Sequence, residues 1–82
     1  MKVQSKFSNG QEITSYQATA YAEGFEEASF EDQLRAWAYL IATGTAWRLQ
    51  GWFGRQAEAL INNLMISRDG IIDYDRIEEL SE

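Results

Sequence analysis

Apolar residues recur at helical spacing along two stretches of the chain. The first stripe has four members, at i, i+4, i+7 and i+11: Phe30, Leu34, Trp37 and Ile41. This period predicts a helix from Phe30 to Thr43 with one apolar face. Ser29 can cap its first turn by accepting backbone N–H groups, and Gly44 can adopt the left-handed conformation that ends it.

Five residues form the second stripe, at i, i+4, i+7, i+8 and i+11: Phe53, Ala57, Leu60, Ile61 and Leu64. It predicts a helix from about Phe53 to Met65. Between the two stripes, Thr45 to Gln50 has room for one or two helical turns before Gly51 interrupts them. Two amphipathic helices joined by so short a connection must pack against each other to bury their stripes.

The segments that flank the helix pair each carry a turn signal. Asn9-Gly10 favours a β-hairpin turn, so residues 1–13 are expected to form either a short hairpin or an irregular arm that leads into a first helix. Asp69-Gly70 predicts a second turn, after which Asp73 can cap a last helix that runs to Leu80.

The whole chain, residues 1–82, is therefore expected to be one small domain. Its fold is predicted to be mainly α, with a central helix pair and, as one alternative, a short N-terminal β-hairpin. A composition that is 45% hydrophobic and 13% aromatic can supply a packed core at this length. No internal repeat and no low-complexity linker divides the sequence.

Charge is concentrated at the two ends of the chain. The net charge is −6, of which residues 1–29 carry −2, residues 68–82 carry −4 and the middle is neutral. The acidic C-terminal segment, residues 69–82, and the negative total disfavour nucleic acid as a partner. No apolar run approaches the roughly 20 residues that span a bilayer, so the expected location is the cytoplasm, away from membranes.

The residue types that most enzymes use for chemistry are scarce. The chain has no Cys and no His, which excludes disulfides, the usual zinc sites and His or Cys catalysis. An EF-hand alignment on Gly70 places Arg76 where the bidentate Glu should stand, so calcium binding is not expected. We expect no metal, no cofactor and no enzymatic activity.

A helix-turn-helix interpretation is also available, since a helix from Phe53 would carry Arg55 and Gln56 at its start. Glu58 on the same helix and the acidic total argue against DNA recognition.

Tryptophan and arginine alternate in the neutral middle of the chain. Four residues are the candidate protein-binding site: Trp47, Arg48, Trp52 and Arg55. Exposed Trp and Arg are typical of interaction hot spots, and arginine can stack on an indole ring. The alternative is that the three arginines of this middle segment pair with Glu31, Asp32 or Glu58; these arginines are Arg35, Arg48 and Arg55. In the same alternative, residues 51–55 form a tight turn whose rings fill the core.

Residues 40–61 resemble short uncharacterised proteins encoded by tailed bacteriophages. The shared pattern reads Leu-Ile-x-Thr-Gly-x-x-Trp-x-Leu-Gln-Gly-x-aromatic-Gly-Arg-x-Ala, and it covers roughly a quarter of this chain. The resemblance implies a phage accessory protein that acts inside an infected bacterium. It attaches no biochemical activity to the family.

Three functions are consistent with these observations. The preferred one is a non-enzymatic accessory protein that binds a host or phage protein. One alternative is an acidic nucleic-acid mimic that occupies a host defence or DNA-binding protein. The other is a structural component that self-associates into a homo-oligomer through exposed aromatic residues.

Overall fold

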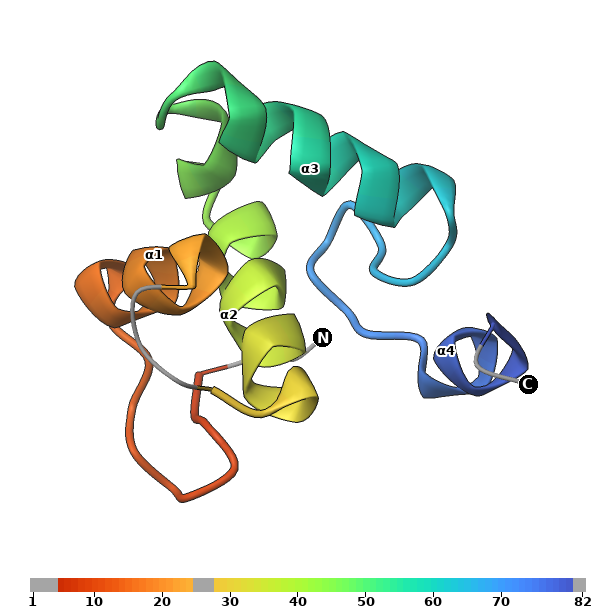
Figure 1. Cartoon of the computed structure of the whole chain (residues 1–82), viewed down its shortest axis with the longest axis horizontal. Coiled ribbons are helices and arrows are strands. Elements are labelled where there is room, and N and C mark those ends of the chain that lie inside the picture. Colours follow the sequence, from red (N-terminus) through yellow and green to blue (C-terminus); the bar gives the residue numbers. More distant parts are fainter. Residues whose placement is uncertain (1–4, 25–27, 81–82) are drawn as a thin grey trace.

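The computed structural model describes residues 5–24 and 28–80, and within these the regular structure is helical (Figure 1). The elements are α1 (Ser15–Glu23), α2 (Phe30–Ala42), the 3₁₀ helix η1 (Thr45–Trp47), α3 (Gly51–Asn62) and α4 (Tyr74–Leu80). The predicted mainly α fold is confirmed. In the described ranges the alternative with an N-terminal hairpin is not supported, because no strand forms there; residues 1–4 lie outside the described residues.

Helix α2 is the central element. Ser29 caps its start, accepting a hydrogen bond at Oγ from the backbone N–H of Asp32 at 3.1 Å, as predicted. Gly44 follows its end with φ +77°, and this positive φ also agrees with prediction. Leu34 is buried on the apolar face, as predicted, but Phe30, the first residue of the predicted stripe, is 60% exposed.

Helix α3 differs from its predicted range at both ends. It begins at Gly51 rather than Phe53, so the expected tight turn at residues 51–55 is instead the first turn of the helix. Burial of Phe53, which is 2% exposed, outweighs the low helix propensity of the glycines. The helix ends at Asn62, and Leu64, predicted to lie in the apolar stripe, is 65% exposed.

The two central helices meet mainly through rings. Trp37 of α2 contacts Phe53 of α3 with ring centroids 6.0 Å apart, and α1 packs more extensively along α2 than α3 does. The core is one cluster whose buried members come from both turns and all helices except α4: Phe7, Ile13, Ala18, Leu34, Ala36, Trp37, Ala38, Leu40, Ile41, Ala46, Phe53, Ala57, Leu60, Ile66 and Ile72.

The two predicted turns have the same backbone geometry. In the first, the Gly10 N–H donates to the Phe7 carbonyl at 2.9 Å; in the second, the Gly70 N–H donates to the Ser67 carbonyl at 2.9 Å. Each turn closes one isolated antiparallel bridge and each glycine has a positive φ, +89° and +83°. A helix follows each turn, α1 after the first and α4 after the second, so the chain repeats one turn-to-helix unit that the sequence did not reveal.

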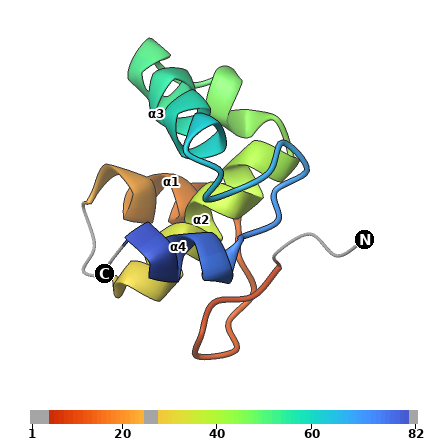
Figure 2. The ribbon, with the colours of Figure 1, turned by 90° about the vertical axis from the view of Figure 1, so that its right-hand side faces the viewer.

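The second unit is held against α2. Gly70 is buried beside Ala38 and Ala42 of that helix. The Tyr74 hydroxyl at the start of α4 donates a 2.6 Å hydrogen bond to Oε2 of Glu31, so α4 lies beside the N-terminal half of α2 (Figure 2). Asp73 caps α4, accepting from the backbone N–H of Arg76 at 3.0 Å, as predicted.

Candidate functional site

Trp47 is the centre of the predicted site and is held in one orientation. It closes η1 and is 41% exposed. Its indole Nε1–H donates to Oε2 of Glu58 at 3.1 Å, and its ring lies against Gly54 of α3. A Cβ at position 54 would stand 3.3 Å from the ring atom Cδ1, which explains why a glycine occupies the interior of this helix.

Glu58 joins Trp47 to a more distant part of the chain. Its carboxylate accepts two hydrogen bonds from the Arg68 guanidinium, at 2.9 Å from Nη2 and 3.2 Å from Nη1. The hydrogen bonds from Arg68, helped by the one from Trp47, hold the pKa of the Glu58 carboxyl below its ordinary value. The pair therefore remains ionised at neutral pH and fixes the exposed edge of the indole.

Arg48 follows Trp47 and bonds to the end of α2. Its Nη2 donates to Oγ1 of Thr45 at 3.2 Å and to the Thr43 carbonyl at 3.5 Å. This arrangement places a positive charge at the C-terminal end of α2, where the helix dipole favours it. The Arg48 side chain is exposed but already has hydrogen-bond partners within the fold.

Trp52 takes part in the ring packing at the start of α3. Its ring stacks on Phe53 at a centroid distance of 4.0 Å and meets Trp37 edge to face at 6.3 Å. It is still 37% exposed, so Trp52 covers the core and also remains partly accessible to solvent.

Arg55 is exposed and, within residues 5–24 and 28–80, its side chain makes no hydrogen bond or ion pair. It lines a surface hollow of about 600 Å³ between η1 and α3, together with Trp47 and Glu58. Its guanidinium has five donors and no acceptor among the described residues, so it is available to a partner.

The structure thus brings only part of the predicted set together. Trp47 and Arg55 line the same hollow, whereas Arg48 and Trp52 do not line it. The predicted stacking of arginine on tryptophan is not found in the described part of the chain, where the ring contacts are between aromatic residues. We call the four residues Trp47, Arg48, Trp52 and Arg55 the Trp47–Arg55 surface.

The alternative that the three central arginines, Arg35, Arg48 and Arg55, pair with acids is confirmed for Arg35 and, within the described residues, for neither of the other two. Arg35 donates through Nε to Glu31 at 2.8 Å, one helical turn away on α2. Glu58 takes Arg68 rather than any of the three central arginines. Sequence reasoning missed this pair because Arg68 lies beyond the end of α3, and the chain reversal after the helix brings it back.

Neither a metal site nor a membrane span is present in the part of the chain that the structure describes. No three acidic side chains gather there closely enough to hold an ion. No helix there has the length and apolar character needed to cross a bilayer.

Comparison with known proteins places the chain in a family. The family model for a domain of unknown function, DUF7417, matches residues 15–81, which span all four α-helices and most of the chain. No curated protein and no solved structure matches the sequence. The chain belongs to the DUF7417 family.

Proposed function

We propose that this domain is a non-enzymatic protein-binding module that uses the Trp47–Arg55 surface. The observation that carries the proposal is that Arg55, which is exposed and has no partner among the described residues, lines the same hollow as the half-exposed Trp47. Tryptophan and arginine are the residues most enriched at the energetic centres of protein interfaces.

Rigidity of the surface supports the same proposal. Trp47 is held by contact with Gly54 and by a hydrogen bond to Glu58, and Glu58 is held in turn by Arg68. A ring that is already fixed loses little rotamer entropy when a partner covers it. Arg55 then supplies directional hydrogen bonds to a carboxylate or to backbone carbonyls of the partner.

The biological setting that we propose is a bacteriophage accessory protein that binds a host or phage protein in the cytoplasm of the infected bacterium. Its support is the resemblance of residues 40–61 to short phage proteins, a stretch that contains the whole Trp47–Arg55 surface.

A pull-down from infected and uninfected bacterial lysates, with captured proteins quantified by mass spectrometry, tests the proposal. Arg55→Ala should reduce capture of the specific partner about tenfold, because truncation of a hot-spot arginine weakens binding by at least this factor. Lys6→Ala is the matched control, since it removes an exposed positive charge elsewhere and should capture as much as the unaltered protein. Arg48→Ala should reduce capture less, because that side chain is already bonded within the fold.

If Arg48→Ala and Arg55→Ala both capture as much partner as the unaltered protein, the Trp47–Arg55 surface is not the binding site. Retention at high salt supports an interface built on aromatic and arginine contacts. A partner retained only at low salt would favour the acidic nucleic-acid mimic instead. Recovery of the bait alone, with concentration-dependent oligomers, would favour the self-associating component.

A further inference from the structure

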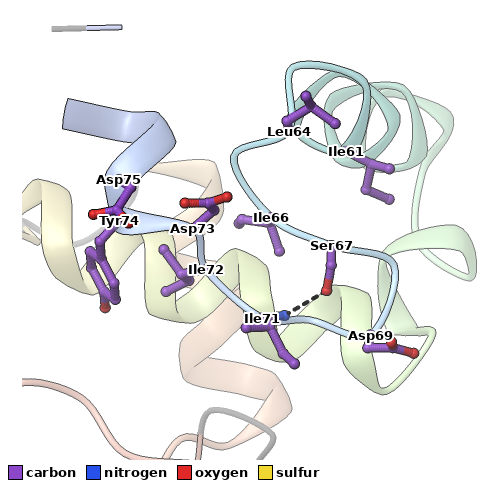
Figure 3. A pocket seen from close by; sticks show the side chains of 10 residues that line it. All are labelled: Ile61, Leu64, Ile66, Ser67, Asp69, Ile71, Ile72, Asp73, Tyr74 and Asp75. Atoms are coloured by element: carbon purple, nitrogen blue, oxygen red, sulfur yellow. Dashed lines mark hydrogen bonds between the residues drawn. The ribbon is translucent and has the colours of Figure 1, made fainter. Parts of the chain in front are cut away.

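A second hollow lies between the end of α3 and the start of α4, on residues separate from the Trp47–Arg55 surface (Figure 3). It encloses about 760 Å³. Its apolar lining comes from five aliphatic residues: Ile61, Leu64, Ile66, Ile71 and Ile72. Ile66 and Ile72 are buried and form the floor, whereas Leu64 and Ile71 are 65% and 38% exposed. We call this hollow the Leu64 groove.

Leu64 occupies a position where a glycine is normally found. Helix α3 ends with the Met65 N–H bonded to the Leu60 carbonyl at 3.0 Å and the Leu64 N–H bonded to the Ile61 carbonyl at 2.9 Å. This is the Schellman arrangement, whose residue after the cap has a positive φ. Leu64 has φ +63°, a conformation that carries an energetic cost for a residue with a Cβ. Since its side chain is mostly exposed, packing within the domain does not offset that cost.

Carboxylates stand at both ends of the groove. Asp69 lies at one end and Asp73 and Asp75 at the other, with the isoleucines between them (Figure 3). Asp73 caps α4, but Asp69 and Asp75 make no side-chain hydrogen bond or ion pair within the described ranges 5–24 and 28–80. The groove is apolar along its length and negatively charged at its ends.

The nearby arginines do not neutralise these carboxylates. Arg68 pairs with Glu58 on α3, away from the groove. Arg76 donates through Nε to the Asn63 carbonyl at 3.0 Å and lies 3.8 Å from Glu79. The charge at the groove ends therefore attracts cations from outside the domain.

We propose that the Leu64 groove binds a basic amphipathic helix of a partner protein. Leucine-like side chains at i, i+3, i+4 and i+7 of such a helix would fill the space beside Leu64 and Ile71. Lysine or arginine on its flanks would meet Asp69 at one end and Asp75 at the other. Nucleic acid and anionic lipid carry the wrong charge for this site.

An extended peptide fits less well than a helix, because the backbone around the groove is already bonded. The Ser67 N–H donates to the Ile71 carbonyl, the Ile71 N–H to Oγ of Ser67, and the Asp73 N–H to the Met65 carbonyl. The turn thus offers few free donors for strand addition, and side-chain contacts must provide the affinity.

Fluorescence anisotropy with a labelled model peptide tests the proposal. The probe is a helical peptide of about 14 residues, made only of leucine and lysine, with leucines at the helical spacing given above. Leu64→Gly should weaken binding about tenfold, as expected for loss of a central apolar anchor. The same variant should fold at least as stably as the unaltered domain, because glycine favours the positive φ. Loss of binding therefore cannot be a loss of folding.

The charge contribution is tested with a matched pair of double variants. Asp69→Asn with Asp75→Asn should weaken binding about tenfold at low salt and much less at about 1 M salt, where the Debye length is about 3 Å. Glu12→Gln with Glu23→Gln removes the same charge from exposed positions elsewhere and should leave binding unchanged.

Three results would overturn the proposal. One is equal binding by Leu64→Gly and the unaltered domain. The second is equal weakening by the two double variants, which would mean non-specific attraction to an acidic protein. The third is equal binding of a peptide with the same composition in alternating order, which cannot form an apolar helical face.

Discussion

Gly70 offers the sharpest test of how the second turn-to-helix unit is attached to α2. Its φ is +83°, and a Cβ added there would stand 2.5 Å from Cβ of Ala42 and 2.6 Å from the carbonyl oxygen of Ala38. One atom is a Cβ and the other a backbone oxygen of helix α2, so neither can move away by rotation of a side chain. Gly70→Ala therefore requires the turn and α2 to separate.

The expected loss has two parts. A positive φ costs a residue with a Cβ about 1–2 kcal/mol, and forcing an additional methyl group into a packed contact costs about 1–3 kcal/mol. Gly70→Ala should thus lower the free energy of unfolding by about 2–5 kcal/mol. A domain of this size has about 4–12 kcal/mol in total, so the variant loses a large part of its stability.

Gly10 provides an internal control because it occupies the equivalent place in the first turn. Its φ is +89°, but no atom lies within 4 Å of the position that its Cβ would take. Gly10→Ala should therefore cost only the backbone contribution, about 1–2 kcal/mol. The entropy that alanine removes from the unfolded chain is the same in both variants and cancels in the comparison.

Urea unfolding followed by tryptophan fluorescence measures both variants, with the slope against urea checked for constancy. Gly70→Ala should unfold at clearly lower urea than Gly10→Ala. Equal destabilisation of the two variants would refute the reasoning, because it would mean that the close approach of Gly70 to α2 contributes nothing beyond its φ.

Two further predictions concern α2. The hydrogen bond from Tyr74 holds the pKa of the Glu31 carboxyl below its ordinary value, with Arg35 helping and partial burial opposing. This stability is present above the unfolded pKa of about 4.3 and is lost as the pH falls through the lower folded pKa, so Tyr74→Phe should flatten the dependence of stability on pH in that acidic window. Identical acid titrations of unfolding would contradict the assignment. Ser29→Ala should lower the unfolding free energy by about 1 kcal/mol in urea, because it removes the cap of α2, whereas Ser29→Gly should cost only a few tenths; equal losses would mean that the hydroxyl does not act as a cap.

Local sequence patterns predicted a helix well where the hydrophobic period and the capping residues were sufficient to define it. The apolar stripe of α2 repeats every three or four residues along the chain. Its cap Ser29 and the glycine after its end act on backbone groups that lie within about four residues of them. The cap Asp73 and the Asn9-Gly10 turn are local in the same way, since each hydrogen bond closes a short loop of chain. Such features need no knowledge of the rest of the fold.

The errors occurred where distant contacts outweighed local preference. Gly51 and Gly54 suggested a turn, yet they lie in α3 because Phe53 fills the core and the ring of Trp47 covers Gly54. Leu64 continued the apolar period of α3, yet the helix had already ended and its side chain faces solvent.

The candidate surfaces show the same division. The occurrence of tryptophan and arginine close together in the sequence indicated that Trp47 and Arg55 were candidates. Only the fold placed them in one hollow and left Arg55 without a partner among the described residues. The Leu64 groove was not predicted at all, because its two walls belong to α3 and to the turn before α4.

The sequence by itself thus determined a small, acidic, mainly α domain and the approximate positions of its helices, because hydrophobic period and capping act within one or two turns of chain. Tertiary structure alone decided which rings are buried, which arginine lacks a partner among the described residues and where the two hollows lie. Those properties depend on the packing of segments far apart in sequence, such as Glu58 with Arg68 and Glu31 with Tyr74. No local pattern records such packing, since each pair forms only when the chain between its members has folded back.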